Sequence, residues 1–436
     1  MRLRWISLLL LLGCASDPAA RVRGEFRHAW DGYVRHAWGH DELRPVSQTA
    51  HDWAAESLLI TPVDSLDSLV LLGFPEEASR TAEYIATHLS FDRDIWVKNF
   101  EITIRVLGGL LSSYQLLGDP RLLALADDLG KRLLPVFDSP TGMPYVDVNL
   151  RTGKVRGAES NPAEIGTLLL EFGTLARLTG TDLYYDRAKR ALVALYQRRS
   201  KLDLVGEGMN VETGAWTSRA SHVGGGIDSY YETLLKSWLL FGDEDCHRMW
   251  LASARALDAH VADEQPSGLW YGEVDMDDGR RTATGFGALE AFLPAVLALG
   301  GDVARARRLE DSAFAMWTAN GIEPDGYDYR TGRVTEPGYP LRPEIIESAY
   351  YLAHFTGDGR YRDMGRRFLD DLVACCRTES GYTTLKNVVT REKGDLMPSY
   401  FLAETLKYLY LLAAPGAIDL EKVVFTTEAH PLRRTW

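Results

Sequence analysis

The sequence predicts an all-α protein, an (α/α)7 barrel of seven helical hairpins with small β-hairpins or loops at one end. Two observations lead to this prediction. Apolar helical runs end in glycine seven times, at steps of about 60 residues for all but the first step. The run before each glycine is apolar on most sides, whereas the run after it is amphipathic. The seven glycines are Gly73, Gly118, Gly180, Gly242, Gly301, Gly357 and Gly416.

Each of these glycines predicts a tight turn between two helices. Glycine suits the position just after a helix, where the backbone angle φ is positive. Asp or Thr-Asp usually follows, as in Leu-Leu-Gly118-Asp-Pro, and such residues cap the start of the next helix. A repeat of this length fits one helical pair and a long return loop.

The two helices of each predicted pair differ in polarity. The runs 106–117, 165–178 and 234–241 are apolar almost all round and nearly devoid of charge, whereas 121–134 and 360–373 carry many charges on one face. A helix that is apolar on every side is buried, and an amphipathic one lies outside. We therefore expect an inner and an outer ring in a closed barrel, because an open solenoid leaves inner helices exposed. The alternating segments 144–157 and 202–214 predict β-hairpins or long loops.

The chain starts like an exported protein. Two arginines precede a short apolar run, and the ending Leu-Leu-Gly-Cys at residues 11–14 resembles a bacterial lipobox. We expect residues 1–13 to be a signal peptide, 14–24 a tether lipidated at Cys14, and 25–436 a single catalytic domain. The predicted location is the periplasm or cell envelope, although plain signal cleavage is the alternative. The net charge of −13 argues against nucleic acid and, apart from the lipid, against an anionic membrane as partner.

The other cysteines, Cys246, Cys375 and Cys376, have no zinc-type spacing. A disulfide between Cys246 and one of the adjacent pair is one reading, and three buried thiols are the other.

Acidic residues recur near the start of the predicted inner helices: Glu101, Glu164, Asp228, Glu344 and Glu404. In a barrel these helices run the same way, so the five carboxylates meet at one mouth. Carboxylates are also favoured at helix N-termini by the helix dipole, which explains any single one of them. As a group in an apolar ring they predict a site, since clustered buried charge is costly without a ligand. Two carboxylates, one acid and one base, are what glycoside hydrolysis requires.

Several long stretches resemble glycoside hydrolase family 47, the class I α-1,2-mannosidases. They are 28–33 with 37–46, 99–112, 228–236, 341–348, 404–408 and 424–431. They span nearly the whole mature chain, and the start of the chain looks bacterial. The resemblance implies an (α/α)7 barrel and a calcium-dependent, inverting exo-α-1,2-mannosidase that releases mannose from α-1,2-linked mannosides.

The resemblance also implies residue roles. Glu101 falls at the general-acid position and Glu344 at the general-base position, with Asp228 as third catalytic carboxylate. Whether Glu101 or Asp228 delivers the proton stays open. Thr427 falls where the family binds Ca²⁺ through the threonine carbonyl and hydroxyl, with waters and sugar hydroxyls completing the shell. The substrate-binding positions are Arg105, Glu164, Arg342, Glu347, Tyr400 (usually Phe), Glu404 and Glu428.

Three departures from the family pattern bear on function. Ala291 and Ala313 appear where eukaryotic members carry a disulfide. Gly226 stands where these enzymes carry Arg or Leu, which implies a more open leaving-group subsite. The lectin-like branch of the family gives an alternative function, mannose-glycan binding without catalysis. All three catalytic carboxylates and Thr427 are present, which favours the enzyme.

Overall fold

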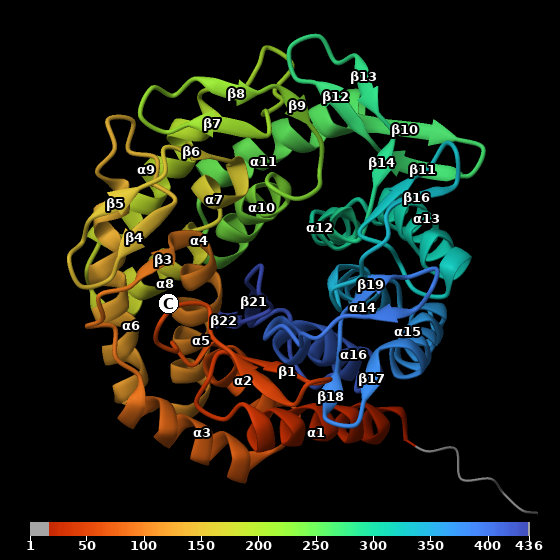
Figure 1. Cartoon of the computed structure of the whole chain (residues 1–436). Coiled ribbons are helices and arrows are strands. Elements are labelled where there is room, and N and C mark those ends of the chain that lie inside the picture. The colour runs from red at the N-terminus through yellow and green to blue at the C-terminus, as the bar shows by residue number, and fades with distance from the viewer. Residues whose placement is uncertain (1–16, 435–436) are drawn as a thin grey trace, which may run out of the picture.

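The computed structural model describes residues 17–434, which form two concentric rings of helices around a common centre (Figure 1). The inner ring contains α2 (Ile60–Leu71), α5 (Gly108–Leu117), α7 (Pro162–Gly166) with α8 (Leu169–Thr179), α10 (Asp228–Phe241), α12 (Leu293–Leu299), α14 (Glu344–Thr356) and α16 (Leu406–Ala413). The outer ring contains α1 (Pro18–His36), α3 (Pro75–His88), α6 (Pro120–Leu133), α9 (Leu183–Tyr196), α11 (Glu244–Ala256), α13 (Val303–Asn320) and α15 (Arg360–Cys376). The predicted (α/α)7 barrel is confirmed.

The turn glycines explain how the rings are connected. All seven have positive φ, from 67° at Gly357 to 95° at Gly301. The predicted aspartate caps follow in several turns. For example, the Asp119 carboxylate accepts a hydrogen bond from the Arg121 backbone N–H at 2.9 Å. Because these turns are short, each inner helix before α16 packs directly on the outer helix that follows it.

The seventh pair is formed differently from the other six. Gly416 does turn the chain after α16, but among the described residues no helix follows it. Instead α16 packs against α1, the first helix of the chain. The barrel therefore closes by joining its two ends, and six hairpins plus this closing pair make up the seven.

Helix α1 also starts earlier than the expected domain boundary. We expect residues 18–24 to belong to a tether, but the Asp17 side chain caps the helix and Pro18 occupies its first turn. Val22 is buried, so this segment belongs to the barrel. The expected signal peptide and Cys14 lie outside the described residues. None of the helices in the described part of the chain is long and apolar enough to cross a membrane.

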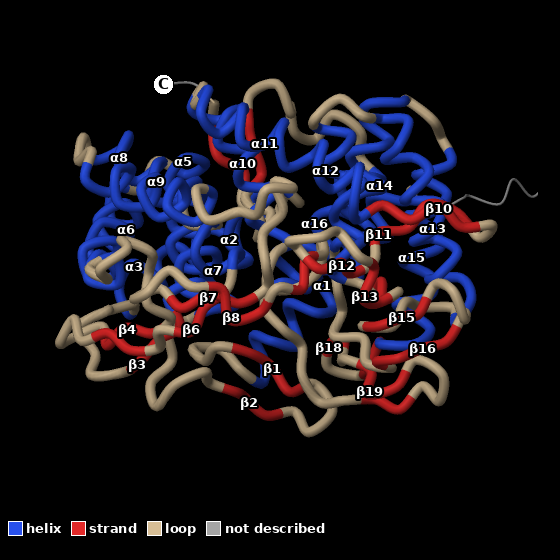
Figure 2. The backbone as a smooth tube through the Cα atoms, turned by 90° about the horizontal axis from the view of Figure 1, so that it is seen from above, coloured by secondary structure: helices blue, strands red, loops and turns tan. Residues whose placement is uncertain are grey.

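Most of the short antiparallel strands lie together at one end of the barrel (Figure 2). They are β1 (Glu42–Arg44), β2 (Thr49–His51), β3 (Trp96–Lys98), β4 (Asp147–Asn149), β5 (Val155–Arg156), β6 (Glu159–Ser160), β7 (Gly208–Asn210), β8 (Trp216–Ser218), β9 (Ala220–Ser221), β12 (Glu273–Asp275), β13 (Arg281–Ala283), β14 (Gly285–Phe286), β15 (Gly326–Asp328), β16 (Arg333–Glu336), β17 (Arg377–Thr378), β18 (Gly381–Tyr382), β19 (Leu385–Asn387) and β20 (Glu392–Lys393). The pair β4–β5 lies inside the predicted segment 144–157, and β7 lies inside 202–214.

Two further hairpins complete the strands. β10 (Ala262–Gln265) pairs with β11 (Gly268–Tyr271), and β21 (Val423–Phe425) pairs with β22 (Pro431–Arg433). The last hairpin lies inside the ring and packs against α10 and α5 (Figure 1). The chain's C-terminal part thus fills the centre of the barrel.

The inner helices carry more charge than the nearly uncharged helices that the sequence analysis describes. They bury Asp64, Asp67, Glu171, Lys236 and Lys407, all at 1% exposure or less. Most of these groups are paired: Lys407 Nζ lies 2.8 Å from Asp67 Oδ1, and Lys236 contacts Glu232. Buried charges are tolerated when they are paired in this way.

The described cysteines Cys246, Cys375 and Cys376 are free, and Cys246 and Cys376 are buried. The predicted disulfide is therefore wrong. The prediction of three buried thiols holds for Cys246 and Cys376, whereas Cys375 is only partly buried. Ala291 and Ala313 are both fully buried in the core.

Candidate active site

A cavity of about 300 Å³ opens at the strand end of the barrel. All eleven residues singled out from the sequence line it: Glu101, Arg105, Glu164, Asp228, Arg342, Glu344, Glu347, Tyr400, Glu404, Thr427 and Glu428. Glu101, Asp228 and Glu344 are more than a hundred positions apart in sequence. Only closure of the barrel brings them together, since each lies at the start of a different inner helix.

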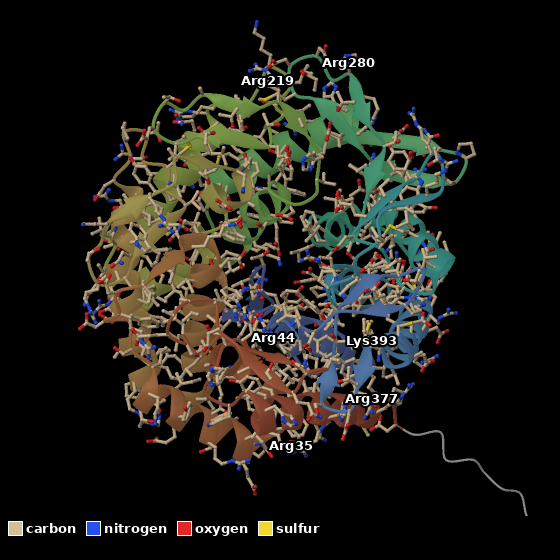
Figure 3. The ribbon with its side chains drawn as sticks, in the orientation of Figure 1. Arg35, Arg44, Arg219, Arg280, Arg377 and Lys393 are labelled. Carbon is tan, nitrogen blue, oxygen red and sulfur yellow. The ribbon has the colours of Figure 1, made fainter. Side chains whose placement is uncertain are left out.

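The cavity is strongly acidic. The lining contains Glu101, Glu164, Asp228, Glu232, Glu344, Glu347, Glu404 and Glu428 against Lys98, Arg105 and Arg342. Behind the lining, the buried Lys236 offsets part of this charge, since it contacts Glu232 and lies 3.6 Å from Glu347. Arg219 and Arg280 lie at the periphery of the barrel (Figure 3). Burial, and after it the neighbouring carboxylates, raise the pKa of several of these groups. The excess of carboxylates suits ligands with many hydroxyls or a hard cation.

Glu101 is held by an arginine one turn further along the same helix. It ends α4 (Asn99–Glu101), and a π-helical turn, Ile102–Leu107, carries Arg105. Arg105 Nε lies 3.1 Å from Glu101 Oε2, and its Nη1 contacts Glu428. π-Helical turns often occur at functional sites. Here the turn aims a guanidinium between the carboxylate of Glu101 and the centre of the barrel.

Asp228 is the first residue of α10. Its Oδ1 accepts a hydrogen bond from the Ser229 backbone N–H at 2.7 Å and a second from the Ser229 hydroxyl at 3.3 Å. Burial raises the pKa of Asp228 to about 6, although these hydrogen bonds lower it. The nearby Glu232, one helical turn on, raises it further.

Glu344 is the first residue of α14 and is the least satisfied carboxylate of the three. Its Oε2 is buried and has no hydrogen-bond partner among the described residues. Burial raises the pKa of Glu344 to about 8, while the charge of Arg342 opposes the shift. The free oxygen leaves room for a water molecule beside Glu344, and in its ionised form the carboxylate can take a proton from that water.

The floor of the cavity combines carboxyls with an aromatic ring. The Tyr400 hydroxyl donates to the Pro340 carbonyl at 2.7 Å, and its ring lies 5.3 Å from the Arg105 guanidinium and 5.8 Å from that of Arg342. Glu347 accepts a hydrogen bond from Tyr408 at 3.1 Å, and burial raises its pKa to about 7. Burial and the neighbouring Glu344 also raise the pKa of Glu404 well above its usual value.

Thr427 lies at the turn between β21 and β22. Neither its hydroxyl nor its carbonyl oxygen forms a hydrogen bond with another residue in the part of the chain that the structure describes. Within residues 17–434, no three His, Cys, Asp or Glu side chains are grouped to hold a metal ion. Two unpaired oxygens beside an acidic cavity fit the donor chemistry of Ca²⁺, which accepts oxygen ligands and waters.

The sequence reasoning missed several lining residues. Glu232 shares a helix face with Asp228 at a spacing of four residues, so helical periodicity was a signal for it. Lys98 and Asn161 lie in a strand and a loop, and no local pattern marked them. Their place in the site follows from how the loops fold over the barrel end.

A barrel of two helical rings with carboxylates converging at the start of its inner helices defines a glycoside hydrolase class of site. Residues 25–434 match the model of "Glycosyl hydrolase family 47", and the chain belongs to this family of glycoside hydrolases.

Named relatives agree with this assignment. "Alpha-mannosidase I MNS5" of Arabidopsis thaliana is 38% identical over 442 residues, covering 95% of this chain and 76% of the relative. The mouse "Endoplasmic reticulum mannosyl-oligosaccharide 1,2-alpha-mannosidase" is 36% identical, covering 96% and 68%. The solved structure of an "alpha-1,2-mannosidase from Trichoderma reesei" superposes with a TM-score of 0.88 at 28% identity, covering 96% of this chain and 99% of that one. These relatives come from a plant, a mammal and a fungus, so a bacterial origin stays a prediction.

Proposed function

We propose that the protein is a calcium-dependent, inverting exo-α-1,2-mannosidase that releases mannose from α-1,2-linked mannosides. The names of its relatives support the substrate class. The observation that carries the proposal is the cavity in which Glu101, Asp228 and Glu344 meet in three different environments. Carboxyls in different surroundings can divide between them the acid and base roles that a glycosidase needs.

Glu344 is the general base in this proposal. It takes a proton from a water molecule that attacks the anomeric carbon, and its unpaired Oε2 is available for that water. The leaving oxygen receives a proton from the opposite side of the sugar. Glu101 and Asp228 are the two candidates for this step. Glu101 already accepts a hydrogen bond from Arg105, whereas burial favours the protonated form of Asp228.

The remaining lining residues bind the terminal sugar. Arg105, Arg342 and the carboxyls of Glu347, Glu404 and Glu428 offer donors and acceptors to its hydroxyls, and Tyr400 packs under the ring. Thr427 would hold Ca²⁺ through its hydroxyl and carbonyl. When bound there, the ion supplies positive charge that orients sugar hydroxyls.

The proposed partner is therefore a mannose-containing di- or oligosaccharide. We keep the proposal that the protein is exported and anchored in the cell envelope through a lipid on Cys14. Mass spectrometry of the mature protein from its native host tests this, with an acylated N-terminal cysteine as the expected result.

Proton NMR of the first minutes of reaction with α-1,2-mannobiose tests the mechanism. We expect β-mannose first, since a water activated by Glu344 attacks from the face opposite the leaving group. Initial α-mannose would assign a covalent role to the carboxylate instead. Binding without any release of mannose would favour the lectin-like alternative.

A further inference from the structure

The exposure of the lining residues shows which part of the cavity is deep and which is its mouth. Glu404 and Glu428 are 6% and 3% exposed and lie at the bottom. The side chains of Lys98 and Glu101 are 42% and 26% exposed and lie towards solvent. In an exo-acting enzyme the terminal sugar occupies the bottom. The sugar on the leaving-group side of the scissile bond then lies at the mouth, near Lys98.

Lys98 is fixed at the mouth by an ion pair. It ends strand β3, where it pairs with Asp147 of β4 in the sheet. Its Nζ lies 2.6 Å from Oε1 of Glu164. Although burial lowers the pKa of Lys98, the hydrogen bond and charge of Glu164 raise it overall, so the ammonium stays charged. An ammonium has three donors, and this pair uses one of them.

Glu164 is in turn held in one orientation. Its Oε2 accepts a hydrogen bond from the Ser160 hydroxyl at 3.2 Å, and the Asn161 side chain caps its backbone N–H at 2.9 Å. Lys98 and Glu164 therefore present a donor and an acceptor side by side. This arrangement matches two neighbouring hydroxyls of a sugar ring, which both donate and accept.

Space for such a ring lies beside the pair. Gly226 lines the cavity with φ +88°, and the atoms nearest to a Cβ built there, from Asn161 and Glu207, are 3.8 Å away. Gly226 itself places no side chain in this part of the mouth, and Asn161 connects it to Glu164. The open volume and the polar pair thus adjoin each other.

We propose that Lys98, paired with Glu164, determines specificity by binding the sugar on the leaving-group side through its ammonium. This inference rests on the proposed function, since it assumes cleavage of a sugar–sugar bond. The ligand is a neutral sugar with adjacent hydroxyls, recognised outside the deep part of the cavity.

The test compares Lys98→Met with wild type in two measurements. The first is kcat/KM for α-1,2-mannobiose, which fills both positions. The second is the inhibition constant of 1-deoxymannojirimycin, an iminosugar the size of one mannose that fills only the bottom. We expect kcat/KM to fall about tenfold, because a charged hydrogen bond is lost. The inhibition constant should stay within about twofold of wild type.

Two variants complete the design. Lys98→Arg keeps the charge and should recover part of the lost kcat/KM. Lys154→Met removes an exposed lysine outside the cavity and should change neither measurement. The proposal is overturned if Lys98→Met weakens the inhibitor as much as the disaccharide, or changes neither. Failure of the wild-type protein to release mannose would instead overturn the proposed function.

Discussion

Nδ1 of His430 lies 2.7 Å from Oδ2 of Asp67, although 363 positions separate the two residues in sequence. Nε2 of the same ring lies 3.2 Å from Asp64 Oδ1, and Lys407 donates to the Ala429 carbonyl at 2.6 Å. All of these side chains are fully buried. They fix the turn after β21, in which the non-glycine Ala429 takes φ 57°. This turn carries Thr427 and Glu428 to the bottom of the cavity.

His430→Leu should destabilise the protein strongly, because it leaves two buried aspartates without their shared partner. Breaking a buried pair in this way costs about 3–5 kcal/mol. Chemical unfolding in urea measures the loss. The control His88→Ala removes an exposed histidine at the end of α3 and should cost no more than about 0.5 kcal/mol. Equal stability of both variants would contradict the anchoring role.

The pH dependence of stability should change when Glu171 is replaced. Both oxygens of this fully buried carboxyl lack partners among the described residues, and burial raises its pKa from 4.5 to about 8. Between these values the folded state keeps a proton that the unfolded state has released, so Glu171 makes stability fall as pH rises.

Glu171→Gln removes this titration, and its stability relative to wild type should rise with pH between about 5 and 8. The slope for one group is at most about 1.4 kcal/mol per pH unit. Urea unfolding of both proteins at several pH values in this window provides the measurement. If the free energies of unfolding of the two proteins changed with pH in parallel, the pKa of Glu171 would be the same in the folded and unfolded states.

Removal of calcium should abolish activity without unfolding the barrel. Thr427 offers only its own hydroxyl and carbonyl, so the core does not depend on the ion for packing. Mannose release after exhaustive treatment with EDTA, together with circular dichroism, tests this. Calcium should restore activity better than magnesium, which demands a tighter octahedral shell. Full activity of the chelated protein would refute the calcium requirement.

Glu344→Gln should lower kcat by about 10²–10⁴-fold while leaving disaccharide binding within a few-fold, because the amide keeps the shape but cannot take a proton. Steady-state kinetics and calorimetric binding of α-1,2-mannobiose separate the two effects. Glu336→Gln, at an exposed position in β16, is the matched control and should behave like wild type. A near-normal kcat in Glu344→Gln would remove Glu344 from the reaction.

The sequence by itself determined the barrel and most of the cavity. Glycine turns such as Gly118 and caps such as Asp119 are local signals in the sequence. A helix that is apolar on every side can be predicted to be buried even when the residues that cover it are unknown. The carboxylates of Glu101, Asp228 and Glu344 were detectable because each stands at the start of an inner helix. The family resemblance added Thr427, which no local pattern marks.

Only the tertiary structure decided the rest. The closing pair of α16 with α1 joins the two ends of the chain, so no turn between them exists to be recognised. The ion pair between Asp67 and Lys407 could not be predicted, because the two residues are distant in sequence. Lys98 could not be assigned to the site from the sequence either, because its ion pair with Glu164 forms only when separate loops meet over the barrel. The propensity to form a helix or a turn depends on neighbouring residues, whereas the pairing of buried charges depends on the packed fold.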